Sequence, residues 1–229
     1  MKIITDTFMI KRNQRIGQIT TIGSLVVLAG GLFLSFQKDQ RYVSFSFLAL
    51  LFGFILSQVG IYFGNRYGRR PRPDEQLDIG LKGLDDKYTL YHYVVPAPHL
   101  LVGPAGVWIL FPFTQGGTIT FQKGRWRQRG GNWYLKFFAQ EGISRPDLDI
   151  EVNTEKIKKL LSRQLPGYTL PPIQAALVFA NEKAVISCDD APAPTLPLSK
   201  LKEFLRKKAK ANPLPIDVVN HITEALPYI

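Results

Sequence analysis

Histidine, cysteine and paired carboxylates are the side chains that most often carry chemistry, and this 229-residue chain places few of them in recognisable patterns. Its three histidines, His92, His99 and His221, are scattered, and its one cysteine, Cys188, excludes an internal disulfide. No Ser-His-Asp or Cys-His arrangement and no metal-ligand spacing can be assembled from them. The glycine-rich stretches lack the Lys-Ser/Thr ending of a phosphate-binding loop. We therefore expect no bound metal and no cofactor.

Cations alternate with aromatic residues between positions 123 and 137. The aromatic members are Trp126, Trp133, Tyr134 and Phe137. Such interleaving suits single-stranded nucleic acid or lipid headgroups, and it is also typical of a half-buried strand with its aromatic residue inward and its arginines outward. We favour the strand. The residues retained as a basic and aromatic contact surface are Lys123, Arg125, Trp126, Arg127, Arg129 and Lys136.

Residues 99–113, HLLVGPAGVWILFPF, form two apolar runs separated by Gly-Pro-Ala-Gly. Val, Ile, Leu, Trp and Phe favour strands and the Gly-Pro pair favours a tight turn, so the stretch predicts a buried β-hairpin. It also resembles the central hairpin of the NERD (nuclease-related) domain family, whose fold is restriction-endonuclease-like. The residues that carry this resemblance are His99, Gly103, Pro104, Gly106, Val107, Gly117 and Trp126.

The resemblance implies a metal-dependent nuclease scaffold, but three positions depart from the family pattern. Pro98 stands in place of a metal-binding Asp, Phe111 in place of a Glu and Phe113 in place of a Lys. Phenylalanine can neither hold Mg²⁺ nor act as a cation beside an attacking water. We therefore expect a non-catalytic NERD-like interaction or accessory module, in which the two phenylalanines fill the former metal cleft or dock a partner. The alternative is a membrane-tethered nuclease or nucleic-acid-binding protein whose acids come from Glu75, Asp78, Asp85 or Asp86.

The net charge of +11 is concentrated in the first third of the chain. Residues 1–73 carry ten Lys or Arg and two acids, whereas the remainder carries 19 Lys or Arg and 16 acids. These cations bracket two uncharged apolar runs, residues 16–36 and 42–65, and a membrane-spanning helix needs roughly 20 such residues. A short polar link joins the runs, which predicts a helical hairpin in the lipid bilayer. The alternative, a signal peptide plus one anchor, has no small-residue cleavage pattern to support it.

Small residues form a stripe along each predicted span. The stripe on the second span is Ser46, Ala49, Gly53, Ser57, Gly60 and Gly64, and the comparable face of the first span is Gly17, Thr21, Ser24, Leu28, Gly31 and Ser35, in which Leu28 is the one large residue. Such faces let helices approach closely, so we expect the two helices to pack on each other, with a membrane-protein partner as the alternative. Lys and Arg flank the outer ends of the hairpin. The positive-inside rule therefore places both termini, and everything after residue 66, on the cytoplasmic side of a bacterial inner membrane.

The region after the hairpin alternates helices and strands. We expect helices at 73–84, 154–164, 198–209 and 215–226, and strands at 88–95, 99–102, 107–113, 118–121, 125–129, 133–138, 173–180 and 184–188. The run 173–180 predicts a central strand buried on both faces. We expect 118–121 to be the third strand of the meander that contains 99–102 and 107–113, and 184–188 to continue the sheet after 173–180. The basic helix at 198–209 has a membrane-interfacial alternative. The predicted fold class is a transmembrane helical hairpin (1–73) followed by an α/β domain (74–229) with a mixed sheet flanked by helices.

Overall fold

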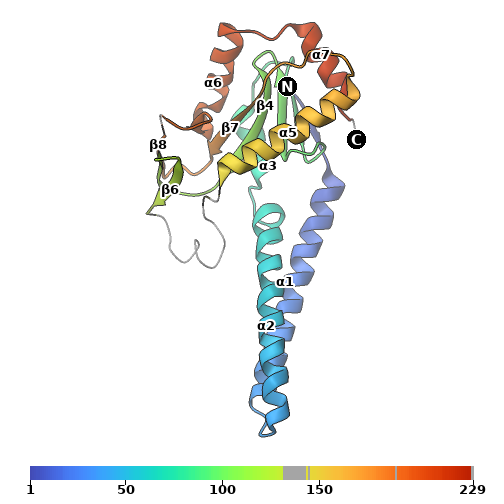
Figure 1. Cartoon of the computed structure of the whole chain (residues 1–229), viewed down its shortest axis with the longest axis vertical. Helices are drawn as coiled ribbons and strands as arrows, with labels where there is room; N and C mark the ends of the chain where they lie inside the picture. Colours follow the sequence, from blue (N-terminus) through green and yellow to red (C-terminus); the bar gives the residue numbers. More distant parts are fainter. Residues whose placement is uncertain (131–142, 144, 189, 228–229) are drawn as a thin grey trace. The chain divides into compact units, whose positions relative to one another are not determined.

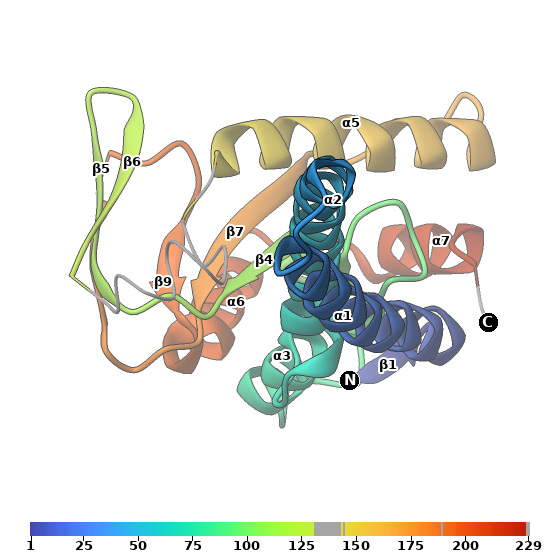
Figure 2. The ribbon, with the colours of Figure 1, turned by 90° about the horizontal axis from the view of Figure 1, so that it is seen from below.

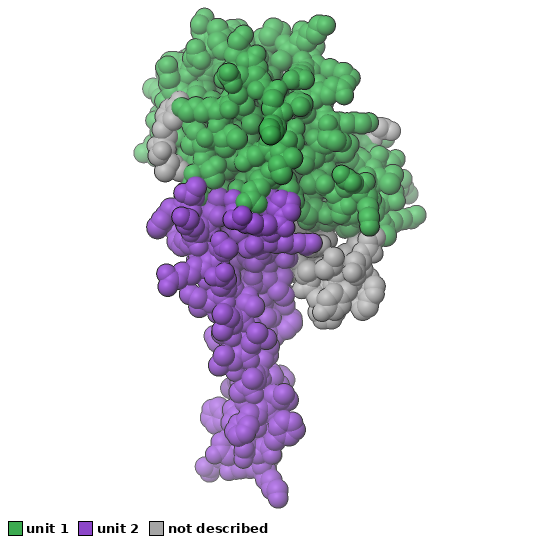
Figure 3. Space-filling model, turned by 180° about the vertical axis from the view of Figure 1, so that it is seen from behind, with its two compact units in different colours: residues 1–6, 73–133, 141–229 green, residues 7–72, 134–140 purple. Residues whose placement is uncertain are grey.

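The computed structural model describes residues 1–130, 143, 145–188 and 190–227, and it divides into two compact units (Figure 3). The hairpin unit consists of residues 7–72. The α/β unit consists of residues 1–6 and the described residues from Pro73 onward. Long apolar N-terminal helices and a mixed α/β sheet region are thus both present, as predicted.

The hairpin unit contains helix α1 (Thr7–Ser35), helix α2 (Gln40–Phe63) and a short π-helical segment, η1 (Gly64–Gly68) (Figure 1). Asp39 begins α2, because its carboxylate accepts the backbone N–H of Arg41 at 2.9 Å. At about 1.5 Å per residue, both helices exceed the roughly 30 Å thickness of a bilayer core.

Small residues at seven-residue intervals lie at the contact between the two helices. Those buried are Gly17, Ser24 and Gly31 on α1 and Ser46, Gly53 and Gly60 on α2. The Ser46 hydroxyl donates to the carbonyl of Gly31 at 2.7 Å across this contact. A Cβ added at Gly60 would lie 3.0 Å from the backbone nitrogen of Thr21. The prediction that the small-residue faces pack on each other is confirmed.

Large apolar side chains cover the outside of both helices. Phe33 is 66% exposed and Phe47 is 68% exposed. Only 17% of the most apolar stretch of each helix is buried, whereas the core helix of a water-soluble protein would be mostly buried. Both helices are long and apolar enough to cross a membrane, and this surface is suited to lipid rather than to water.

The α/β unit is built on a six-stranded mixed sheet. Its strands lie in the order β1 (Lys2–Thr5), β2 (Thr89–His92), β3 (His99–Gly103), β4 (Gly106–Phe113), β7 (Ile173–Phe179) and β9 (Thr195–Pro197). Strands β2, β3 and β4 are antiparallel neighbours, β1 pairs in parallel with β2, and β7 pairs in parallel with both β4 and β9. Strand β1 was not predicted. Its pairing assigns residues 1–6 to the α/β unit rather than to a hairpin segment that begins at residue 1.

A separate three-stranded sheet has the order β6 (Arg125–Arg129), β5 (Gly117–Gln122) and β8 (Ala184–Ser187). The prediction that β5 continues the meander of β3 and β4 was wrong, because β5 pairs with β6 and, in parallel, with β8. Strand β8 likewise leaves the main sheet instead of continuing it after β7. The predicted strand 133–138 lies outside the described residues.

Helices cover both faces of the six-stranded sheet (Figure 2). On one face, α5 (Pro146–Gln164) and α7 (Ile216–Ala225) bury side chains such as Ile157 and Ile222 against the sheet. On the other face, α3 (Pro73–Leu81) and α6 (Leu198–Ala211) bury side chains such as Leu77 and Leu201. Successive residues of β7 alternate between these two cores, so this strand is buried on both faces, as predicted.

Two of the helices differ from their predicted form or role. Helix α5 begins at Pro146, eight residues before the predicted start at residue 154, and Pro146 with two acids in the first turn is an ordinary helix start. Helix α6 does not lie on a membrane through its apolar stripe, because Leu201 is fully buried against the sheet. Its cations have a local role, since Lys202 and Arg206 donate to the carbonyls of residues 82 and 83 just after α3, at 3.0 and 2.9 Å.

Candidate functional site

The two phenylalanines of strand β4, Phe111 and Phe113, lie in or against the core of the α/β unit. Phe111 on β4 is 9% exposed and pairs with Leu177 of β7, on the sheet face covered by α5 and α7. The ring of Phe113 stacks on that of Phe179 at 5.2 Å, with 18° between their planes. The backbone carbonyl of Pro98 accepts the N–H of residue 93 at 2.9 Å. Phe111 is thus part of the packed interior of the α/β unit.

The turn between β3 and β4 requires both of its glycines. Gly106 has φ +109°, a conformation that side chains rarely adopt. A Cβ at Gly103 would overlap the ring of Tyr88, which packs directly on the strand at this point. Burial is the main reason that the pKa of the Tyr88 phenol is raised above its ordinary value. The turn is completed by Trp108, whose indole N–H donates to the carbonyl of Ala105 at 2.8 Å.

The acids considered as relocated metal ligands are Glu75, Asp78, Asp85 and Asp86. Two of them, Asp85 and Asp86, have separate local roles. Asp85 accepts the backbone N–H of Lys87 at 3.0 Å. Asp86 lies 2.7 Å from the amino group of Met1, and this ammonium lowers the pKa of the Asp86 carboxyl. Among the described residues, no group of three or more His, Cys, Asp or Glu side chains could hold a metal ion.

Two of the histidines that are scattered in the sequence form a buried network with an aspartate. His92 and His99 lie opposite each other on the antiparallel strands β2 and β3, and their Nδ1 atoms are 2.7 Å apart. Each residue is at most 2% exposed. On the other edge of the His92 ring, Nε2 lies 3.0 Å from Oδ1 of Asp78 on α3. His221 lies apart from this network and packs its ring against Tyr168 at 4.8 Å.

The two ring nitrogens of His92 have different partners in this network. Because a carboxylate only accepts, His92 donates its Nε2–H to Asp78, and the facing Nδ1 atoms of His92 and His99 share one hydrogen bond. Asp78 and His99 lie at opposite edges of the His92 ring, so one metal ion could not bind all three. The network therefore joins α3 to the β2–β3 hairpin. The sequence HYVVPAPH could have predicted this histidine pair, because a hairpin centred on residues 95 and 96 places His92 opposite His99.

Strand β6 separates its cations from its tryptophan. Its exposed residues are Arg125, Arg127 and Arg129. Trp126 turns to the opposite face and packs against the ring of Phe121 at a centroid distance of 5.0 Å. Lys123 lies in the preceding turn with φ +51°. The alternation is that of a half-buried strand, whereas base stacking would need rings on the cationic face. Lys136 lies outside the described residues.

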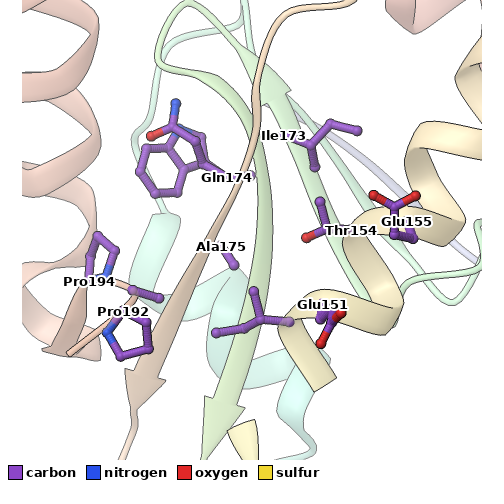
Figure 4. Close-up of a pocket in the computed structure, with 11 residues that line it drawn as sticks. Glu151, Thr154, Glu155, Ile173, Gln174, Ala175, Pro192 and Pro194 are labelled. Carbon is purple, nitrogen blue, oxygen red and sulfur yellow. The ribbon is translucent and has the colours of Figure 1, made fainter. Parts of the chain in front are cut away.

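A cavity of about 530 Å³ lies at the edge of β7 within the α/β unit (Figure 4). We call it the β7 groove. Its lining includes Glu151, Thr154 and Glu155 of α5, Ile173, Gln174 and Ala175 of β7, Pro192 and Pro194 of the segment before β9, and Trp108 of β4. Figure 4 shows the two glutamates on one side of the strand and the two prolines on the other. Sequence reasoning missed this groove, because it joins four segments that are separated along the chain.

Comparison of the chain with protein-family models, with curated proteins and with solved structures finds no match. The buried phenylalanines, the histidine network and the β7 groove are therefore the features on which a function is based.

Proposed function

We propose that this chain is a two-pass protein of the bacterial inner membrane whose α/β unit is a non-catalytic, NERD-like binding module on the cytoplasmic face. The observation that carries the proposal is Phe111, a buried apolar side chain at the position where a nuclease-related hairpin would carry a metal-binding Glu. Its neighbours on β7 are also apolar, so the interior of the sheet at this point is packed and dry.

The pairing of β1 with β2 supports a two-pass arrangement. Strand β1 precedes α1 in the chain and β2 follows α2, yet the two strands are hydrogen-bonded neighbours from Lys2↔Thr89 to Thr5↔His92. If α1 crosses a bilayer, α2 must bring the chain back before β2 can pair with β1. Both outer ends of the hairpin therefore lie on one side of the membrane.

The distribution of cations supports the cytoplasmic side. Lys11, Arg12 and Arg15 precede the first uncharged run, and four arginines occur between residues 66 and 72. The connection between the helices has only Lys38 and Arg41, which are offset by an aspartate. Because Lys and Arg in short flanking segments are retained in the cytoplasm, the α/β unit is proposed to lie there.

A cleavage assay tests the non-catalytic part of the proposal. The full chain, purified in an uncharged detergent, is incubated with Mg²⁺ and with single-stranded DNA, double-stranded DNA and RNA. We expect no metal-dependent cutting. Cutting that requires Mg²⁺ and is lost in both Glu75→Gln and Asp78→Asn variants would show instead a nuclease with relocated acids.

A further inference from the structure

We infer that the β7 groove binds an extended basic segment of a partner protein, which adds to the open edge of β7 as a further strand. This inference rests on the proposed function, because it names the class of partner that a non-catalytic binding module would take. It depends on three features of the groove: the hydrogen-bonding direction of β7, the prolines before β9 and the charges on α5.

The backbone of β7 has an open edge in the groove. The N–H of Ala180 donates to the carbonyl of Phe113 on β4 at 2.8 Å, whereas the N–H of Leu177 donates to the carbonyl of Pro194 at 2.9 Å. Alternate residues of a strand point their backbone groups to opposite neighbours, so Ala175 faces the same side as Leu177. The pairing of β7 with β9 begins only at Leu177. The N–H and C=O of Ala175 are therefore directed into the groove, beyond the end of that ladder.

Proline prevents the chain from covering this edge itself. If the parallel ladder continued by one more step, the N–H of residue 194 would donate to the carbonyl of Ala175. Residue 194 is proline, which has no N–H, and residue 192 is proline as well. Ala175 is 7% exposed, and backbone groups so deeply placed are normally hydrogen-bonded. An added strand offers the missing N–H donor, which is the basis of β-strand addition in peptide recognition.

The lining of the groove specifies the side chains of the added strand. Its successive residues would point alternately to the two faces of the sheet. On the face of α5 they would meet the carboxylates of Glu151 and Glu155, which suit Lys or Arg. On the other face they would meet Gln174 and the ring of Trp108, whose N–H is already used, so an apolar residue fits there.

The charges around the groove favour the same pattern. The ammonium of Lys158 lies 3.7 Å from the carboxylate of Glu155, and both side chains are exposed. Such an exposed ion pair contributes little to stability, so Glu155 can exchange Lys158 for a cation of the partner. Acids at this edge would repel a nucleic acid or an anionic headgroup. The segment that fits therefore alternates basic and apolar residues.

The test uses the full chain in an uncharged detergent and the fluorescein-labelled peptide Lys-Val-Lys-Val-Lys-Val, with binding followed by anisotropy. We expect saturable binding that a Glu-Val-Glu-Val-Glu-Val peptide does not compete. The double variant Glu151→Lys, Glu155→Lys should weaken binding at least about tenfold, because two attractive pairs become repulsive. The matched control, Glu182→Lys with Glu224→Lys, makes the same change in net charge outside the groove and should bind as the wild type does.

A peptide with N-methyl groups on alternate residues tests the strand itself. Loss of the donors to β7 should weaken binding by about fivefold or more, and the unmodified peptide should slow hydrogen exchange of the Ala175 amide. Binding that is indifferent to N-methylation and to charge reversal at Glu151 and Glu155 would overturn the inference, as would no binding at all. Cleavage of nucleic acid by the same preparation with Mg²⁺ would instead overturn the proposed function, so the two failures are distinguishable.

Discussion

Replacement of the two buried histidines by phenylalanine should reveal a coupled pair. The His92→Phe change leaves the Nδ1 of His99, which is 2% exposed, without its partner at 2.7 Å. The loss of a hydrogen bond by a buried polar atom lowers the free energy of unfolding by about 1–3 kcal/mol. The His99→Phe change strands the Nδ1 of His92 at a similar cost. The partner on the other side, Asp78, has a side chain that is 34% exposed and can reach water, so its loss of a donor costs little.

The double variant removes both polar rings together, so its cost should be smaller than the sum of the two single costs. We expect a coupling free energy of about 1–3 kcal/mol between His92 and His99. Contacts that each ring makes elsewhere cancel in such a double-mutant cycle. The assay is urea unfolding of the full chain in detergent, followed by tryptophan fluorescence. All three tryptophans lie outside residues 7–72, so the signal reports on the α/β unit alone. Single costs that add to within about 0.5 kcal/mol would refute the network.

Three further predictions concern packing and pH. The Gly60→Leu change should separate α1 from α2, because even a Cβ there meets the backbone of Thr21. Cysteine cross-linking between the two helices should therefore fall sharply. The control is Gly30→Leu, whose site is open and which should leave the cross-linking unchanged. The Gly103→Ala change should destabilise the α/β unit by about 1–3 kcal/mol in urea unfolding, since the added methyl overlaps the Tyr88 ring; a wild-type midpoint would contradict this packing. Because burial raises the pKa of Tyr88, the unfolded chain loses this proton first, so stability is unaffected below about pH 10 and falls above it. In a Tyr88→Phe variant, the free energy of unfolding should decline less steeply above about pH 10. Identical pH profiles of stability in the variant and the wild type would contradict a raised Tyr88 pKa.

Much of the hairpin unit could be predicted from sequence, because its signals are local. The uncharged runs cover most of α1 and α2, and the small residues that pack the helices recur at a helical interval that can be counted directly. The start of α1 at Thr7, nine residues before the first run, and the π-helical segment η1 were not predicted. Helix α3 could also be predicted, because it begins with Pro73 and two acids and its leucines lie on one face. The buried alternation of β7 between two cores was visible as a continuous apolar run.

The features that were missed depend on pairing between distant segments. Strand β1 has only four residues, and nothing within Lys2–Thr5 shows that it will join a sheet with residues 89–92. The parallel pairing of β5 with β8 joins residues more than 60 positions apart, so the second sheet had no local signal. The pairing of His92 with His99 is the exception, because a hairpin centred on residues 95 and 96 would have predicted it from local sequence. The β7 groove likewise required the prolines before β9 to be placed against a strand whose position was not known.

Residue accessibility in intact bacteria tests the proposed arrangement most directly. In a Cys188→Ser background, one variant carries Lys38→Cys, between the two helices, and another carries Glu182→Cys, in the turn before β8. Cells are treated with a membrane-impermeant maleimide before and after lysis. We expect the cysteine at position 38 to be labelled in intact cells and the cysteine at position 182 to be labelled only after lysis. Labelling at position 182 in intact cells, or equal protection of both positions, would contradict a hairpin that crosses the membrane twice and holds the α/β unit in the cytoplasm.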